Sequence, residues 1–523
     1  MNMARPRRWW ALGAITLAVL AITLDVTVLA VALPTLAGEL KASESQLQWF
    51  VTAYTLALVA GMLPAGLLGD RYGRRAMMAG ALVLFGIGSA ACAYAPGPEA
   101  FIAARVLLGL AGAVLIVLAL SIITVLFEEA ERPRAVGIWG AANFIGLPLG
   151  PIVGGWMLSH AWWGWIFLMN VPVALLGFIA LLALVPESRA ARRPGIDAAG
   201  VLLSSAGLVA LMYGVVKAGD DGWGASTAIL PAAAGIAILV AFVLWERRVA
   251  LRPGGEPLVD LSLFRSRSFT SGVGLTAFGV FGLFGAMFAL PQYFQAILGT
   301  DPQGSGFRLL PIVAGLIAGA VPADRVAARI GAKGTVAAGF VVVVLSLAVG
   351  ATMTTSSGDA FIAAWTFVLG AGGGLGFATA ASTALVELSA DRSGVGSALL
   401  QAIVKLGPAF GASILGSILN STYRDQVLAQ LAALPPAAAA AVQGSVFGGI
   451  AIAQQLGSAA LLAGVRVAFV AGMDDALRLA AGVAAAGAVL ALAFLPGGVP
   501  RAAATEAVDA RAEHAGRLTE PSQ

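Results

Sequence analysis

The segment Gly66-Leu67-Leu68-Gly69-Asp70-Arg71-Tyr72-Gly73-Arg74-Arg75 differs sharply from the chain around it. It packs three glycines, one aspartate and three arginines into ten residues, directly after a long apolar run. Glycine permits close backbone approach, and an aspartate can cap a helix or pair with a neighbouring arginine. The segment therefore predicts a short charged turn between two apolar helices. The simpler alternative is a loop whose arginines only fix the orientation of the chain.

The composition of the whole chain excludes an ordinary soluble protein. Of its 523 residues, 59% are hydrophobic and only 11% are charged, whereas a soluble domain is about 25% charged. The apolar residues form runs of about 20 residues, the length that an α-helix needs to cross a bilayer. The first run is too long for the apolar core of a signal peptide, which has about 7–15 residues. We therefore expect an all-α integral membrane protein that keeps its first helix.

The apolar runs predict fourteen membrane spans. They lie near residues 10–36, 46–68, 76–95, 100–126, 135–158, 165–186, 197–217, 226–245, 270–293, 309–328, 335–353, 360–386, 394–419 and 474–496. If the N-terminus is cytoplasmic, most of the 31 Lys and Arg residues fall in cytoplasmic loops, as the positive-inside rule requires. Both termini are then cytoplasmic. The stretch 437–473 is expected outside, as helical segments on or near the membrane surface.

A weaker copy of the charged segment follows the tenth expected span. Ala323-Asp324-Arg325 is followed there by Ile330-Gly331-Ala332-Lys333. Transporters are often built from two related halves, and this echo is consistent with such a plan.

Several other classes of function find no support in the sequence. No phosphate-binding loop of the G-x-x-x-x-G-K-[ST] type occurs, so we expect no ATP hydrolysis, no cofactor, and an ion gradient as the energy source. With one cysteine and two histidines, neither a disulfide nor a metal site is expected. No nucleophile, base and orienting group gather on one side, so we expect no enzyme. No basic helix or aromatic-basic platform indicates nucleic-acid binding.

Three charged residues within the apolar spans are candidates for function. Asp25 lies in the middle of the first span, where a carboxylate is costly unless it pairs, protonates or faces a wet cavity. These are the properties of a proton carrier, and the alternative is a structural hydrogen bond. Arg105 in the fourth span is predicted to hold the charge of Asp25, with snorkelling to the interface as the alternative. Lys405 in the thirteenth span is open between a cavity residue and a structural partner of a carbonyl.

The fifth span contains the segment 146–155, with two prolines and four glycines. In a membrane such residues kink a helix and allow a neighbour to pack closely. We expect both a kink and a packing seam. Asn143 and Asn170, polar residues in or near spans, are candidates to line a cavity.

Taken together, these motifs resemble the major facilitator superfamily, and specifically its fourteen-helix drug:proton antiporter group. Residues 66–75 match the superfamily's loop after the second helix in full, and Gly150-Pro151-x-x-Gly154-Gly155 matches the fifth-helix antiporter motif. The resemblance runs over nearly all of the membrane region. Further similar segments are Leu24-Asp25-x-Thr27, Ala32-Leu33-Pro34, Trp165-Ile166-Phe167-Leu168-Met169-Asn170-Val171-Pro172 and Leu290-Pro291-Gln292-Tyr293-Phe294-Gln295.

The resemblance implies two six-helix bundles around a central cavity, with two further transmembrane helices inserted between them. The expected division is 1–190 for the N-terminal bundle and 191–265 for the inserted helices and a cytoplasmic linker. Residues 266–500 would form the C-terminal bundle, with an external loop at about 421–473, and residues 501–523 a disordered cytoplasmic tail.

The resemblance also implies roles for individual residues. Asp25 and Arg105 would couple protons to substrate. The cytoplasmic gate would comprise Gly66, Asp70, Arg71, Gly73, Arg74 and Arg75. The antiporter kink would comprise Gly146, Gly150, Pro151, Gly154 and Gly155. The cavity would be lined by Thr27, Asn143, Asn170, Gln292 and Lys405.

Three positions depart from the pattern of this group. Ala30 stands where the first-helix motif usually has Asn, and Leu108 replaces a Gln that often follows the fourth-helix arginine. Lys405 falls where a Gln is common. These departures affect the expected proton relay and substrate range.

The expected function is proton-driven efflux of small hydrophobic or cationic compounds, such as antibiotics, by alternating access. The expected partners are the small-molecule substrate, protons and the lipid bilayer. We expect a monomer in a bacterial cytoplasmic membrane. Two alternatives stay open: a proton-coupled importer or facilitator on the same fold, and a membrane sensor that transports nothing.

Overall fold

The computed structural model describes residues 5–42, 44–128, 131–190, 193, 195–252, 255–386, 393–431 and 434–496, and within them every regular element is a helix. The elements are α1 (Arg5–Glu39), α2 (Glu44–Tyr72), α3 (Arg74–Ala93), α4 (Pro98–Leu126), α5 (Arg132–His160), α6 (Trp165–Leu168), α7 (Asn170–Leu184), α8 (Ala198–Asp221), α9 (Ser226–Ala250), η1 (Leu261–Arg265), α10 (Arg267–Ala296), α11 (Pro302–Ala320), α12 (Ala323–Gly350), α13 (Asp359–Val386), α14 (Ser393–Leu431), α15 (Pro436–Gly444), α16 (Val446–Gln455) and α17 (Ala459–Phe494). The expectation of an all-α membrane protein is confirmed.

Thirteen stretches of the described helices are long and apolar enough to cross a membrane. Helix α11, with 19 residues, is not among them, since its first turns hold Gln303 and Arg308. It is followed by α12, whose backbone is not helical at Gly331. The tenth expected span, 309–328, therefore corresponds to α11 and the first part of α12. The count of fourteen spans stays a prediction.

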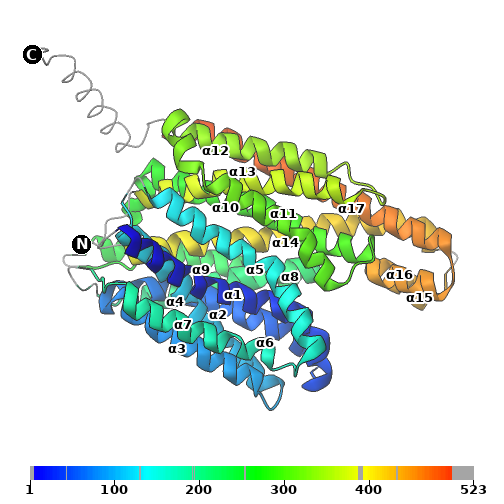
Figure 1. Cartoon of the computed structure of the whole chain (residues 1–523), viewed down its shortest axis with the longest axis horizontal. Helices are drawn as coiled ribbons and strands as arrows, with labels where there is room; N and C mark the ends of the chain where they lie inside the picture. Colours follow the sequence, from blue (N-terminus) through cyan, green and yellow to red (C-terminus); the bar gives the residue numbers. More distant parts are fainter. Residues whose placement is uncertain are drawn as a thin grey trace, which may run out of the picture.

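The helices gather into two groups with separate apolar cores (Figure 1). One core is built mainly from α1–α7 and the other from α10–α17. The first core also includes Phe269 of α10, Leu385 of α13 and Leu399 of α14, so the two groups share buried contacts at one end of the molecule. Helix α8 packs on both α2 and α14, and α9 packs mainly on α8. The proposed division into bundles and inserted helices stays a prediction.

Two helices in the last part of the chain are longer than the expected spans. Helix α14 runs on to Leu431, and α17 begins at Ala459 rather than near residue 474. With α15 and α16, their ends project beyond the other helices (Figure 1). The hydroxyl of the buried Tyr423 fixes this extension, because it donates to the carbonyls of Val442 and Ser445 at 2.8 and 3.2 Å. The stretch 437–473, which is expected to hold helical segments, contains α15, α16 and the start of α17. The tail 501–523 lies outside the described residues.

Candidate functional site

A buried ion pair joins the first and fourth helices. Asp25 of α1 and Arg105 of α4 are both fully buried, and the Nη1 atom of Arg105 donates to Oδ2 of Asp25. The second carboxylate oxygen, Oδ1, accepts a hydrogen bond of 3.1 Å from Nδ2 of Asn170. The Nε atom of Arg105 donates to the carbonyl of Phe50 in α2, at 2.9 Å. Both oxygens of Asp25 are therefore satisfied, as a buried carboxylate requires.

Tyr54 lies between this ion pair and the central cavity. Its ring centroid is 4.4 Å from the guanidinium carbon of Arg105, a cation–π distance, and the same residue lines the cavity. The Tyr54 hydroxyl is buried and has no hydrogen-bond partner among the described residues. Tyr54 thus covers the ion pair on its cavity side with an aromatic ring.

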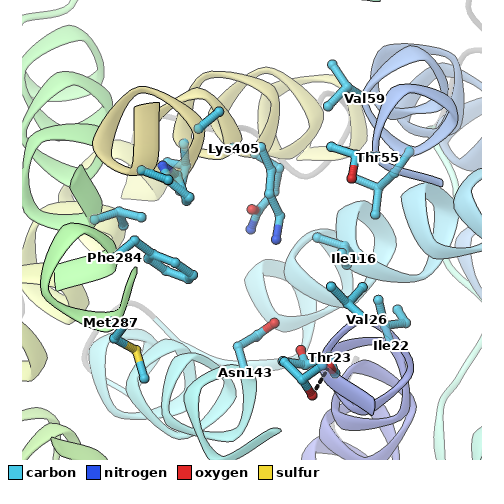
Figure 2. Close-up of a pocket in the computed structure, with 18 of the residues that line it drawn as sticks. Ile22, Thr23, Val26, Thr55, Val59, Ile116, Asn143, Phe284, Met287 and Lys405 are labelled. Carbon is cyan, nitrogen blue, oxygen red and sulfur yellow. Dashed lines mark hydrogen bonds between the residues drawn. The ribbon is translucent and has the colours of Figure 1, made fainter. Parts of the chain in front are cut away.

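The central cavity has a volume of about 500 Å³ and lies between the two groups of helices (Figure 2). Most of its wall is aliphatic or aromatic, with side chains such as Ile22, Val26, Ile116, Phe284 and Met287. A pocket of this size and character suits a small apolar molecule. The polar lining residues are Thr23, Thr27, Tyr54, Thr55, Trp139, Asn143, Gln401 and Lys405.

The residues predicted to line a cavity fall into two sets. Thr27, Asn143 and Lys405 line it. Asn170 does not, because its side chain is buried against Asp25. Gln292 does not either, since its amide donates to the carbonyl one turn before it, that of Phe288, on an exposed part of α10.

The charged segment 66–75 connects α2 and α3 and reaches the second group of helices. Arg74 and Asp70 are both buried, and Nη2 of Arg74 lies 2.7 Å from Oδ1 of Asp70. The other carboxylate oxygen accepts a hydrogen bond of 3.1 Å from the backbone N–H of Val395, in the first turn of α14. A carboxylate at a helix N-terminus is stabilised by the free N–H groups there. Asp70 therefore joins the two groups at the end where their cores also meet.

The remaining residues of this segment shape the turn. Gly73 has φ 114°, a conformation that favours glycine, and a side chain there would collide with Glu187. Glu187 accepts hydrogen bonds of 3.1 Å from the backbone N–H groups of Arg75 and Ala76, and its carboxylate lies 3.9 Å from the Arg75 side chain. The guanidinium of Arg71 lies 5.6 Å from the Tyr72 ring.

Two glycines with positive φ occupy corresponding places in the two groups. Gly331 has φ 77° and interrupts α12, much as Gly73 separates α2 from α3. Gly66, the first residue of the charged segment, is buried in α2. The sequence echo between the two segments therefore has a counterpart in the backbone.

The fifth helix packs its glycines against the first. Side chains at Gly146, Gly150 and Gly154 would overlap or crowd Thr23, Thr27 and Val28 of α1. Glycines spaced four residues apart lie on one face of a helix and let two backbones approach. The Thr27 hydroxyl uses this approach to donate to the carbonyl of Gly146, at 2.9 Å.

The other residues of this motif face elsewhere. Gly155 has no atom within 4 Å of the place where a side chain would begin. Pro148 and Pro151 lie inside α5, which is one helix from Arg132 to His160. Helix α5 also contacts α11 of the second group, where the carbonyl of Pro148 lies against Gly306.

Sequence reasoning missed several residues of the site. Phe50 takes part only through its carbonyl, which leaves no mark in the side-chain pattern. Glu187 and Val395 are distant in sequence from the charged segment that they contact. Tyr54 was detectable as a hydroxyl-bearing residue within an apolar span. Among the described residues, no group of three His, Cys, Asp or Glu side chains is placed to hold a metal ion.

Comparisons with known proteins agree with this architecture. The family model described as Major Facilitator Superfamily matches residues 15–412. The multidrug efflux pump LfrA of Mycolicibacterium smegmatis is 34% identical over 494 residues, which cover 93% of this chain and 96% of that protein. The tetracenomycin C resistance and export protein of Streptomyces glaucescens is 32% identical over 422 residues, 80% of this chain and 78% of that protein.

A solved structure shows the same fold at low sequence identity. The human transporter MFSD10 (TETRAN) matches with a TM-score of 0.60 and 15% identity, covering 94% of this chain and 100% of that chain. That likeness concerns the fold alone. On the family model and the relatives above, the chain belongs to the major facilitator superfamily.

Proposed function

We propose that this chain exports small hydrophobic compounds in exchange for protons. The observation that carries the proposal is the position of the buried Asp25–Arg105 pair. Only the ring of Tyr54 separates this pair from an apolar cavity of about 500 Å³. The relatives named as efflux and resistance proteins support export. Such a carrier needs no cofactor, because the proton gradient supplies the energy.

In this proposal, protonation of Asp25 changes how the first helix is held. A neutral carboxyl no longer balances the Arg105 guanidinium, and breaking a buried ion pair costs about 3–5 kcal/mol. Arg105 keeps the Phe50 carbonyl and the Tyr54 ring but needs water or a new partner to replace the lost charge. Proton uptake is therefore tied to a change that admits water to the pair.

Helix packing connects the Asp25–Arg105 pair to the second group of helices, so that a movement of α1 can be transmitted. Helix α1 carries Thr23, Val26 and Thr27 on the cavity wall and packs on the glycine face of α5. Helix α5 contacts α11 and α13 of the second group. A displacement of α1 is thus passed to the contact between the two groups, where alternation of access takes place.

The rest of the proposal concerns the setting of the protein. The end that holds Asp70 and Val395 faces the cytoplasm, as do both termini, and the membrane is the bacterial cytoplasmic membrane. The basic residues of the charged segment support this orientation through the positive-inside rule. The transporting unit is a monomer, because the cavity lies within one chain.

The test uses proteoliposomes with a pH-sensitive dye inside and an imposed proton gradient. Addition of a panel of lipophilic compounds to the wild type is expected to dissipate the gradient, and Asp25→Asn is expected to abolish this response. The matched control is Asp359→Asn, which removes the same charge from an exposed pair with Arg308 at 3.0 Å. If Asp25→Asn shows the same substrate-driven proton flux as the wild type, the proposal that the Asp25 carboxylate couples protons to substrate is wrong.

Direction is measured in the same vesicles. Antiport predicts that protons and substrate move in opposite directions, whereas an importer moves them together. A rate of substrate movement that does not depend on the proton gradient would indicate a facilitator. If no compound of the panel moves across the membrane, the alternative of a membrane sensor that transports nothing is favoured.

A further inference from the structure

Lys405 is a basic residue of the cavity wall with no hydrogen-bond or ion-pair partner among the residues that the structure describes. It lies in α14 (Figure 2), one turn after Gln401 and one turn before Pro408. All three residues line the cavity. Its Nζ atom makes no hydrogen bond or ion pair with any residue that the structure describes. An ammonium group at this depth is costly unless water or an opposite charge meets it.

The described part of the chain offers no negative charge to this lysine inside the cavity. Among the described lining residues, none is Asp or Glu. Asp25 does not line the cavity, and its two oxygens are held by Arg105 and Asn170. The charge of Asp25 is thus already balanced on the far side of Tyr54, and Lys405 is the one basic side chain among the described lining residues.

The opposite wall offers a hydrogen-bond acceptor. Asn143 donates through Nδ2 to the carbonyl of Trp139, at 3.0 Å, which leaves its Oδ1 atom facing the cavity (Figure 2). The wall also carries the aromatic rings of Phe284, Phe288 and Phe377. The cavity therefore combines one basic side chain, hydrogen-bond acceptors such as that of Asn143, and several flat apolar faces.

We propose that the substrates of this site are apolar aromatic compounds that carry one anionic group, such as a carboxylate or an ionised phenol. Lys405 binds the anionic group, and Asn143 accepts a hydrogen bond from a hydroxyl elsewhere on the same molecule. This rests on the proposed function and narrows its substrates, since cationic compounds meet a like charge at Lys405. Charge-assisted hydrogen bonds are the strong ones, and the apolar wall makes this one stronger.

The test compares three ligands that share one ring system and differ in charge. They are 9-anthracenecarboxylate, its neutral methyl ester and the cationic 9-(aminomethyl)anthracene. Their dissociation constants for the purified full chain are measured at neutral pH by ligand fluorescence. We expect the carboxylate to bind more tightly than the ester, and the ester more tightly than the amine.

Variants then assign the preference to Lys405. Lys405→Gln is expected to weaken carboxylate binding about 10- to 100-fold, to leave the ester nearly unchanged and to strengthen the amine. Lys405→Arg keeps the positive charge and is expected to keep the order of the three ligands. The matched control is Lys333→Gln, a lysine of α12 that does not line the cavity, and it is expected to bind as the wild type.

Three results would overturn the proposal: failure of the wild type to bind the carboxylate, tighter binding of the amine, or an equal loss of all three ligands in Lys405→Gln. The last result would assign Lys405 a structural role. Measuring ligand-driven proton exchange in proteoliposomes with the same three ligands separates the preference for anions from the proposed proton-coupled export. Exchange without a charge preference removes the anion proposal alone, whereas a charge preference without exchange removes the transport proposal alone.

Discussion

The Oδ2 atom of Asp70, near the end of α2, lies 3.1 Å from the backbone nitrogen of Val395, 325 residues later in the chain. The same carboxylate is paired with Arg74 through its other oxygen. One buried side chain therefore connects the turn between α2 and α3 to the start of a helix in the second group.

Asp70→Asn is expected to favour opening at this end. The amide keeps an acceptor for the N–H of Val395, but this contact between the groups is then made to a neutral oxygen and loses part of the about 1.5–3 kcal/mol that a charged hydrogen bond contributes. Spin labels on Tyr72→Cys and Ile330→Cys, both exposed and in different groups, report the separation. The labels require a Cys92→Ala background. We expect a shift to longer distances in Asp70→Asn, and an unchanged distribution would contradict the closure role of Asp70.

Gly150→Ala is expected to impair both stability and transport. A Cβ atom there would overlap the Thr27 side chain, and overpacking typically costs about 1–3 kcal/mol. Gly155→Ala is a matched control in the same helix, because nothing lies within 4 Å of its added carbon. Thermal unfolding in detergent and proton exchange in vesicles measure both effects. Equal behaviour of the two variants would contradict the packing seam between α1 and α5.

Tyr54 variants separate the ring from the hydroxyl. Tyr54→Phe keeps the ring over Arg105 and loses a hydroxyl without a partner, so near-normal exchange is expected. Tyr54→Ala removes a cation–π contact of about 0.5–2 kcal/mol and exposes the ion pair to the cavity. We expect it to leak protons without substrate, as measured by the internal dye. Loss of coupling in Tyr54→Phe would instead show that the hydroxyl carries the proton.

Tyr423→Phe is expected to loosen the projecting extension without changing transport. The hydroxyl holds two carbonyls near α15, and losing a hydrogen bond costs about 1 kcal/mol, or roughly a fivefold increase in local opening. Hydrogen exchange of the amides in α15 and α16 measures this change. Tyr94→Phe, at a residue that is 68% exposed, is the control. Unchanged exchange in Tyr423→Phe would mean that other contacts hold the extension.

The sequence predicted the membrane helices and the charged positions well, because a single Asp or Arg in an apolar run is conspicuous. Asp25 and Arg105 were found in this way, and the structure pairs them. The partners of these residues were harder to predict. A backbone carbonyl such as that of Phe50 has no sequence signal, and Asn170 is equally compatible with a cavity and with a buried carboxylate.

Helix ends were the least predictable feature of the fold. The last span is expected to begin near residue 474, yet α17 begins at Ala459 and continues through Arg466. Ser458 caps that helix by accepting from the N–H of Leu461, at 3.3 Å. Helix hydrogen bonds satisfy the backbone whether or not the side chains are apolar, so hydropathy alone cannot locate such an end.

In the proposed cycle, a positive charge on Lys405 makes the reorientation of the empty carrier depend on the membrane potential. When a wet cavity changes the side to which it opens, the lysine changes its place in the electric field across the membrane. A full crossing of that field is worth about 2.3 kcal/mol per 100 mV for one charge. In the same cycle a bound anion cancels the charge, so the loaded carrier moves outward without sensing the voltage. The membrane potential therefore acts on the unloaded half of the cycle, and pre-steady-state currents would record it as a charge movement that substrate suppresses.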